Sequence, residues 1–241
     1  MISQPPFLPW LGWFDLADQV DELILLDSVQ FDKRSWQQRN RIRTAKGLEF
    51  ITVPVTSAGR FSQTISEVAL ADPVFGVRLL RTLRANYARA PFFAPVIAEL
   101  EEVIPASLAS GLLVDLNEAL IRFLGRWLGI STPIQRASTL KVAGKRGEYL
   151  ALLCQTTGAV DYLSTAGAED YLREDHGHFT SRGITIWLHE YSHPVYSQLH
   201  APFMPYASAL DLVMMSGHSA GDIMRHTGRI LRPLYSKGLY E

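Results

Sequence analysis

The sequence has little cysteine, no long hydrophobic run and almost no net charge, and each shortage excludes a class of protein. Its 241 residues include one cysteine, Cys154, which cannot form an intramolecular disulfide and whose apolar neighbours indicate a core thiol. No run of 18 apolar residues occurs, which excludes a membrane-spanning helix. A net charge of −1 excludes bulk attraction to nucleic acid. We therefore expect a cytoplasmic protein that has no membrane span and no nucleic-acid partner.

Several common catalytic motifs are also missing. There is no P-loop, no GxGxxG fingerprint and no Gly-x-Ser-x-Gly elbow. The segment His189–His193 matches the HExxH pattern of zinc peptidases, but that pattern needs a helix to bring both imidazoles to one ion. The preceding Ile184–Leu188 is typical of a strand, and Pro194 disfavours a helix at His193. On an extended chain the two histidines stand about 13 Å apart, so the sequence predicts no metal site, and it identifies no cofactor.

The hydrophobic pattern predicts an α/β fold with a central mixed sheet, flanking helices and a smaller helical lobe. Strands are expected at residues 1–3, 22–27, 48–55, 64–70, 133–137, 160–163 and 184–189. Helices are expected at residues 11–20, 74–88, 92–104, 112–125, 146–156, 205–215 and 219–231. Residues 73–130 are the expected helical lobe. Residues 1–72, which carry a basic loop, and residues 131–241 are expected to form one α/β domain.

The most informative segment is Asp27–Ile42, which follows an apolar run and is dense in guanidinium, carboxamide and indole groups. Six of the chain's 23 basic residues lie between positions 33 and 46. Such a loop after a buried strand is a common site for an anionic ligand such as a phosphorylated sugar, and a solvated basic loop is the alternative. Lysine and arginine would hold phosphates, Trp36 would stack on a base or sugar, and the amides would bind hydroxyls. The expected binding residues here are Gln30, Lys33, Arg34, Trp36, Arg39, Asn40 and Arg41.

A second candidate region lies after residue 190. His193 follows an expected strand, where an imidazole could act as general base, with Tyr196 positioning or donating a proton and Gln198 beside them. The alternative is that His193 caps a turn and Tyr196 packs in the core. Asp27 ends a buried strand, so it either points into a cleft or caps the next loop. Asp211 lies in an apolar helical pattern. It is expected to be exposed or to pair with a basic side chain, for example an arginine of residues 34–41.

Three blocks of the sequence resemble the WbqC-like family. The first reads QPPFLPWLGWF at residues 4–14 and continues as DSVQFDKRSWQQRNRI at residues 27–42. The second is YLS at residues 162–164, with GA and YL behind it. The third begins HPVYSQ at residue 193 and continues through FMP, Ser208 and LDL to Gly217. This sequence departs from the family pattern at Ser3, Gln38, Thr165, Ala207 and Ser216, where His, Asn, Gly, Leu and Asn are usual.

The resemblance implies a role near the assembly of bacterial surface polysaccharide such as O-antigen, beside enzymes that make modified amino sugars. Gln4 and Ser208, in the first and third blocks, are further expected binding residues. The leading hypothesis is a transferase that places an acyl or aminoacyl group on the amine of a nucleotide-linked or phosphorylated amino sugar. His193, with Asp27 or Tyr196, would manage the proton.

Two alternatives to this transferase stay open. One is a non-catalytic factor that binds a glycan precursor and presents it to another enzyme of the polysaccharide pathway. The other is a nucleotidyltransferase. All three readings require the basic segment and the His193 turn to fold around a shared cavity.

Overall fold

The computed structural model describes residues 1–226 and 229–235, and its strands lie in three small sheets. In the first, β1 (Ile2–Ser3), β2 (Leu23–Leu25) and β5 (Ile134–Arg136) are parallel. In the second, β6 (Asp161–Thr165) is parallel to β7 (Thr185–Tyr191), which pairs antiparallel with β8 (Arg229–Pro233). The third is the antiparallel hairpin of β3 (Arg39–Thr44) and β4 (Gly47–Thr52). The predicted α/β class is confirmed.

The first two sheets meet edge to edge, because β1 lies beside β6. Both strands run in the same direction. The start of β2 and the start of β6 border one cavity, at Glu22 and Asp161, and the ends of both strands border another, at Leu26 and Thr165. Since β1 is parallel to β2, it is also parallel to β6. The strands therefore follow the order β5-β2-β1-β6-β7-β8, and the chain order reverses between β1 and β6. We call this junction the β1–β6 seam; it is a topological switch point, where ligands bind in open α/β sheets.

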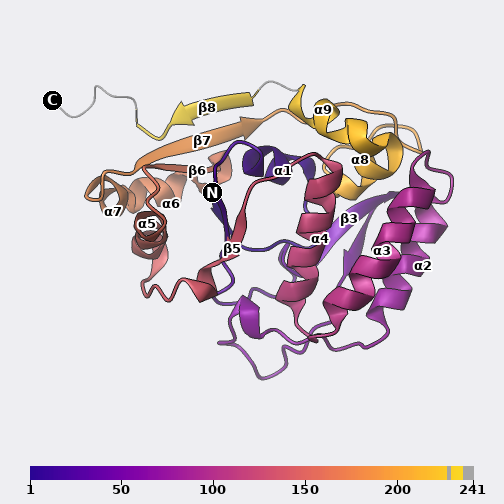
Figure 1. The fold of residues 1–241 in the computed structure, drawn as a ribbon, viewed down its shortest axis with the longest axis horizontal. Helices are drawn as coiled ribbons and strands as arrows, with labels where there is room; N and C mark the ends of the chain where they lie inside the picture. Colours follow the sequence, from indigo (N-terminus) through magenta and orange to yellow (C-terminus); the bar gives the residue numbers. More distant parts are fainter. Residues whose placement is uncertain (227–228, 236–241) are drawn as a thin grey trace.

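The helical segment runs from one end of the molecule, where α2 and α3 lie, to its middle, where α4 lies (Figure 1). It consists of α2 (Phe75–Tyr87), α3 (Phe93–Leu108) and α4 (Leu113–Trp127), which pack in series. Buried residues of these helices recur at spacings of three and four, as in α2 at positions 75, 79, 83 and 87, so each helix turns one apolar face inward. The predicted helices at 74–88, 92–104 and 112–125 are confirmed.

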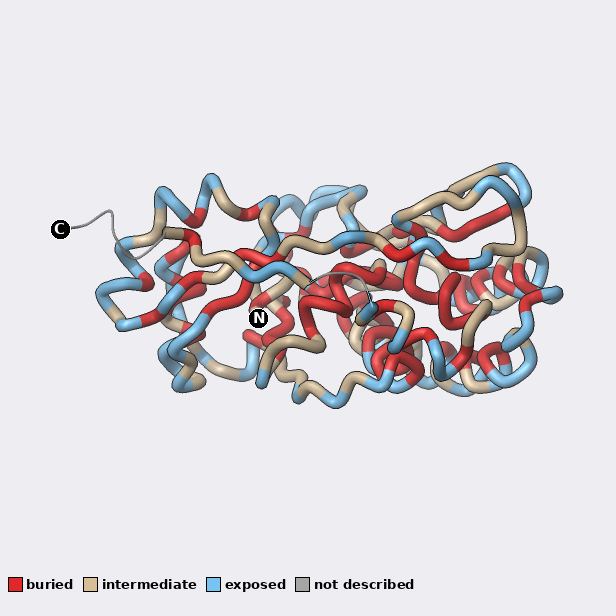
Figure 2. Tube along the Cα trace, turned by 90° about the horizontal axis from the view of Figure 1, so that it is seen from above, coloured by how far each residue is buried: buried red, intermediate tan, exposed pale blue. Residues whose placement is uncertain are grey.

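Two hydrophobic cores hold the chain together, and buried residues run through the middle of the molecule (Figure 2). The larger core joins α2, α3 and α4 to α1 (Leu11–Ala17) and α8 (Ala209–Ser216). The smaller core packs α5 (Arg146–Thr156), α6 (Glu169–Glu174) and α7 (His176–Thr180) against β6 and β7. Cys154 is buried in the smaller core, and burial raises the pKa of its thiol to about 11. The larger core draws on all three predicted chain segments, and their boundaries stay a prediction.

Three expected elements differ from the structure. Residues 64–70 form no strand; a 3₁₀ turn, η1 (Ile65–Glu67), begins there because Thr64 and Glu67 make a reciprocal capping box. Residues 39–44, expected in a loop, form β3. A single helix is expected at residues 219–231, of which residues 227–228 lie outside the described ranges. The described ones belong to η4 (Gly217–Ser219), α9 (Ala220–Arg225) and β8, because β8 pairs with the distant β7. Two further 3₁₀ turns are η2 (Ala137–Thr139) and η3 (Ala166–Ala168).

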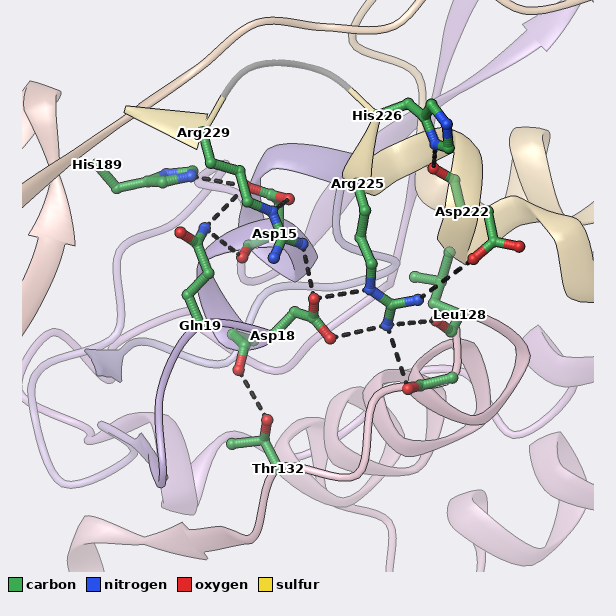
Figure 3. A network of polar contacts seen from close by, with 12 residues as sticks. Asp15, Asp18, Gln19, Leu128, Thr132, His189, Asp222, Arg225, His226 and Arg229 are labelled. Carbon is green, nitrogen blue, oxygen red and sulfur yellow. Dashed lines mark hydrogen bonds and ion pairs between the residues drawn. The ribbon is translucent and has the colours of Figure 1, made fainter. Parts of the chain in front are cut away.

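A network of charged side chains fastens the C-terminal part of the chain to α1 (Figure 3). The fully buried Asp15 lies 2.7 Å from His189 Nε2 and accepts a hydrogen bond from Arg229 Nε at 2.8 Å. One turn later, Asp18 accepts hydrogen bonds from Arg225 and Arg229. The network fixes α1 against β7 and β8. Among the described residues, no helix is long and apolar enough to cross a membrane.

Candidate functional site

A cavity of about 770 Å³ opens at the C-terminal ends of β1, β2 and β6, beside the β1–β6 seam. We call it the switch-point cavity. Its lining comes from four parts of the chain. These are residues 1–4 with Pro6; Trp10, Trp13 and Leu16 with Leu26; residues 35–37 with Asn40 and Arg41; and a C-terminal group formed by Leu150, Tyr162, Ser164, Thr165, Ala168, Tyr171 and Tyr206. Segments more than 100 residues apart in the sequence therefore enclose one space, in the position where α/β folds bind ligands.

The first wall is made by the two halves of the first sequence block, which hydrogen-bond to each other. Asn40 Nδ2 donates to the carbonyl oxygens of Phe7 and Leu8, at 3.2 and 2.7 Å. The Phe7 amide donates to the Trp36 carbonyl at 2.9 Å, and Gln37 Nε2 donates to Gln4 Oε1 at 2.8 Å. The proline-rich segment and the basic segment are thus held together as one wall. The Asn40 amide nitrogen is engaged in these structural hydrogen bonds.

The second wall is the indole of Trp10, which packs over the first turn of α1. A Cβ atom at position 12 would overlap this ring, so only glycine at Gly12 leaves room for it. The Trp10 ring lies 5.7 Å from that of Tyr206 and is nearly parallel to the His193 ring, at 6.5 Å and 12°. Gly12 in the first sequence block thereby connects the N-terminal wall to the third block.

The cavity mouth carries Arg41 among aromatic rings. The Arg41 guanidinium lies 5.6 Å from the centroid of the half-exposed Trp36 ring, and its Nη2 donates weakly to the Tyr206 carbonyl at 3.4 Å. Its Nε is buried and has no hydrogen-bond partner among the described residues. A half-buried guanidinium that lies over a ring and is only weakly bonded to the fold is well suited to bind a phosphate or carboxylate.

Comparison with known proteins agrees with the sequence blocks. The sequence profile of the WbqC-like protein family matches residues 4–223. The chain belongs to the WbqC-like protein family. It is also 36% identical over 226 residues to "Uncharacterized protein Rv1507c" of Mycobacterium tuberculosis (strain ATCC 25618 / H37Rv), covering 93% of this chain and 96% of that protein. No solved structure matches the chain.

The predicted binding residues of this WbqC-like protein divide between the cavity and other surfaces. Gln4, Trp36, Asn40 and Arg41 line the cavity. The others of the basic segment lie outside the lining: Gln30 donates to the Phe61 carbonyl, Lys33 and Arg34 are exposed, and Arg39 stacks on Phe50 at 4.5 Å. Their roles in binding stay predictions.

His193 lies behind the Trp10 wall and outside the cavity lining. Its Nδ1 is 2.8 Å from the Pro194 carbonyl, and its Nε2 is 3.2 Å from the Tyr206 amide nitrogen. A carbonyl only accepts and an amide only donates, so the ring is neutral with its proton on Nδ1. Burial lowers the pKa of His193, in agreement with this state. Both nitrogens support the fold of the third block, and a role as general base stays a prediction.

Asp27 and Tyr196, the other two predicted catalytic residues, are also engaged in the fold. The fully buried Asp27 accepts hydrogen bonds from the amide and hydroxyl of Ser138, and so caps η2. Tyr196 is buried and donates to Asp211 Oδ2 at 2.9 Å. Neither lines the cavity. Their placement gives both a structural role, and a catalytic role for either stays a prediction.

Asp211 is the centre of a buried cluster of polar side chains. In place of the expected arginine from residues 34–41, it accepts hydrogen bonds from Tyr87, Tyr196 and Gln198, each at 2.9 Å. Burial raises the pKa of Asp211, although these donors oppose the shift. Ser208 caps the start of α8 through the amide of Leu210. The third sequence block therefore builds the support behind the cavity.

The C-terminal part of the cavity lining was not among the predicted site residues, although the second sequence block contains much of it. Tyr162, Ser164 and Tyr171 share hydroxyl hydrogen bonds, and burial raises the pKa of both tyrosines. The YLS and YL segments of the second block could have indicated this part of the lining. The HExxH match at residues 189–193 lies on β7 and the following loop, as expected. Within the described ranges, no group of three or more His, Cys, Asp or Glu side chains is arranged to hold a metal ion.

Proposed function

We propose that this WbqC-like protein binds a nucleotide-linked or phosphorylated amino sugar in the switch-point cavity and transfers an acyl or aminoacyl group to its amine. The amine nitrogen would form an amide bond to the carbonyl carbon of an activated donor, which loses its leaving group while the nitrogen loses a proton. This reaction would take place in the cytoplasm, during assembly of a surface polysaccharide. The family and the expected ligand chemistry motivate the proposal.

The single observation that carries the proposal is Arg41 at the mouth of the cavity. Its side chain is half-buried, and the hydrogen bond of its Nη2 to the Tyr206 carbonyl is long at 3.4 Å, so the guanidinium can offer N–H groups to a phosphate. The neighbouring Trp36 presents a half-exposed ring on which a base or sugar can stack. The position at the switch point of the parallel strands supports ligand binding independently of these side chains.

The second candidate function, a non-catalytic factor that presents a glycan precursor, is favoured by the composition of the lining. Among the described lining residues, Arg41 is the one side chain that is charged at neutral pH, and the set contains no carboxylate and no imidazole. Such a site would bind a phosphorylated sugar without an evident proton acceptor. The third candidate, nucleotidyl transfer, would use the same crevice and would consume a nucleoside triphosphate.

Calorimetric titration with UDP-N-acetylglucosamine tests the binding proposal. A charge-assisted hydrogen bond contributes about 1.5–3 kcal/mol, so Arg41→Ala should weaken binding roughly 10- to 100-fold and leave the melting temperature within about 2 °C. Arg60→Ala is the control, because Arg60 is exposed and lies outside the lining. Arg60→Ala should bind normally. An Arg41→Ala protein with wild-type affinity would contradict the proposed site.

Turnover then separates the three candidate functions. Wild-type protein is incubated with amino-sugar nucleotides, activated acyl and aminoacyl donors and nucleoside triphosphates, and the products are identified by mass spectrometry. A sugar whose mass increases by the acyl group supports the transferase. Binding without any product supports the presenting factor, and release of pyrophosphate supports nucleotidyl transfer.

A further inference from the structure

The two ends of the switch-point cavity differ in chemistry. At the mouth, Gln4, Trp36, Tyr171 and Tyr206 are exposed, and Arg41 lies beside Trp36 and Tyr206. The inner end, which we call the floor, consists of the buried apolar residues Ile2, Trp13, Leu16, Leu150 and Ala168. A ligand that fills the cavity must therefore present a polar group to the mouth and an apolar group to the floor.

Polar side chains of the lining have their hydrogen bonds committed to the fold. The buried hydroxyls of Tyr162 and Ser164 bond to each other and to Tyr171. The Ser3 hydroxyl accepts from Trp13 Nε1 at 2.9 Å and lies 3.1 Å from the Gln4 carbonyl, to which it donates. The Asn40 amide donates to two carbonyls, and its oxygen accepts from the Arg41 amide. Gln37 bonds to Gln4 through its nitrogen and to the Asp32 amide through its oxygen. These groups have little capacity left to satisfy hydroxyl groups of a ligand.

This arrangement favours aliphatic groups over sugar hydroxyls at the floor. A hydroxyl that enters without a partner loses its hydrogen bonds to water, which weakens binding. A methylene group that leaves water for an apolar surface strengthens binding by up to about fourfold at 25 °C. The sugar ring and phosphates therefore belong at the mouth, and the aliphatic part of the ligand belongs at the floor.

We propose that the ligand of the switch-point cavity is an amino sugar whose nitrogen carries an aliphatic acyl group longer than acetyl. This inference rests on the proposed function and specifies its substrate or product class. Arg41 holds the phosphate at the mouth, and the acyl chain extends over Leu16 and Leu150 toward Ala168. The cavity then selects ligands by the length of the acyl chain as well as by the phosphate.

A chain-length series tests this inference. UDP-glucosamine is prepared with N-acetyl, N-butanoyl and N-hexanoyl groups, and each compound is titrated against the full protein. Each added methylene should tighten binding about two- to fourfold until the floor is filled. Arg41→Ala should weaken binding of all three compounds by the same factor, because it acts at the other end of the ligand.

Two floor variants and a control locate the acyl chain. Ala168→Leu fills the floor, so it should abolish the gain from longer chains. Leu150→Val enlarges the floor and should extend the gain to longer chains, which keeps the test decisive if Ala168→Leu folds poorly. Ala166→Leu is the control, since it lies in the same 3₁₀ turn and outside the lining.

The outcomes separate this inference from the proposed function. Equal affinity for all three compounds, together with sensitivity to Arg41→Ala, would overturn the inference and leave the binding function in place. Tighter binding of longer chains that Ala168→Leu does not affect would also overturn it, because the chain would then lie elsewhere. Absence of binding by the whole series would overturn both.

Discussion

Replacing Tyr196 with phenylalanine tests whether the third sequence block supports the fold or performs catalysis. The Tyr196 hydroxyl donates to Asp211 Oδ2 at 2.9 Å, and Tyr87 and Gln198 supply the other donors to this carboxyl group. All of these atoms lie behind the cavity wall. Tyr196→Phe retains the ring and removes one donor, so it isolates a single hydrogen bond.

The expected magnitude follows from the charge and burial of Asp211, which is 1% exposed. A hydrogen bond to a charged group contributes about 1.5–3 kcal/mol to the free energy of unfolding. For a chain of this length, that loss corresponds to a melting temperature lower by roughly 4–10 °C. Tyr149→Phe is the control, because the Tyr149 hydroxyl bonds to the neutral Ser28 hydroxyl at 2.6 Å. Its loss should cost only about 1 kcal/mol.

The effect of Tyr196→Phe should also depend on pH. Burial raises the pKa of Asp211 above 3.8, the ordinary carboxyl value, so the folded protein binds a proton more readily than the unfolded chain. The stability from this difference is fully present below the ordinary pKa and is lost as the pH rises through the raised pKa. Because the charged form needs its donors most, the penalty of Tyr196→Phe should grow as Asp211 ionises.

Urea unfolding followed by tryptophan fluorescence, from pH 4.5 to pH 8, measures both effects. The structural reading expects the Tyr196→Phe penalty to exceed that of Tyr149→Phe at pH 8 and to shrink toward pH 4.5. A Tyr196→Phe protein that unfolds like the wild type but has lost turnover would refute this reasoning. Such a result would support the predicted catalytic role of Tyr196 instead.

Three further substitutions test the walls of the cavity and the network behind them. Gly12→Ala should cost about 1–3 kcal/mol of unfolding free energy and weaken ligand binding, because the added methyl group displaces the indole wall; Gly177→Ala, which meets no neighbouring atom, should be neutral in the same assays. Arg229→Ala should lower the unfolding free energy by about 3 kcal/mol in urea titration, because it removes a charged partner of the buried Asp15. Burial alone would raise the pKa of Asp18, but hydrogen bonds from its two arginines lower the pKa overall. This stabilisation is present above about pH 3.8 and is lost as the pH falls through the lowered pKa. In thermal melts, Asp18→Asn should be less stable than wild type at pH 7, and the difference should shrink as the pH falls below 3.8.

Periodic patterns predicted the helices of this fold better than its short strands. In α2 and α4, apolar residues recur on one face, and the expected limits lie within two residues of those observed. β3 is hard to predict because its alternation of arginine with Asn40, Ile42 and Thr44 is also typical of a basic loop. Thr64 and Glu67 carried the capping signal that contradicts a strand at residues 64–70. β8 depends on pairing with β7, which no local pattern of residues 219–231 reveals.

Sequence predicted the parts of the candidate site that local segments determine. It could not predict the parts that depend on contacts between distant segments. Four predicted binding residues, Gln4, Trp36, Asn40 and Arg41, line the cavity. The predicted cavity shared by the basic segment and the His193 turn stays a prediction, because Arg41 contacts Tyr206 but His193 lies outside the lining. Sequence alone could not distinguish a buried structural histidine or carboxylate from a catalytic one, because both occur as polar residues within apolar surroundings. The partners that decide the matter, such as the Tyr206 amide for His193, lie many residues away.

The β1–β6 seam explains why so many polar residues of the sequence blocks have structural roles. Among the described residues, no ladder of hydrogen bonds joins β1 to β6, so other contacts must hold the two halves of the fold together. α1 packs against β6 and β7 from one side of the seam, and the network of Asp15 with His189 and Arg229 fixes it there. The same helix contributes Trp13 and Leu16 to the cavity. Because side-chain contacts hold the seam together in place of a backbone ladder, a ligand has room at the ends of the strands. The residues that stabilise the fold therefore lie directly behind those that would bind that ligand.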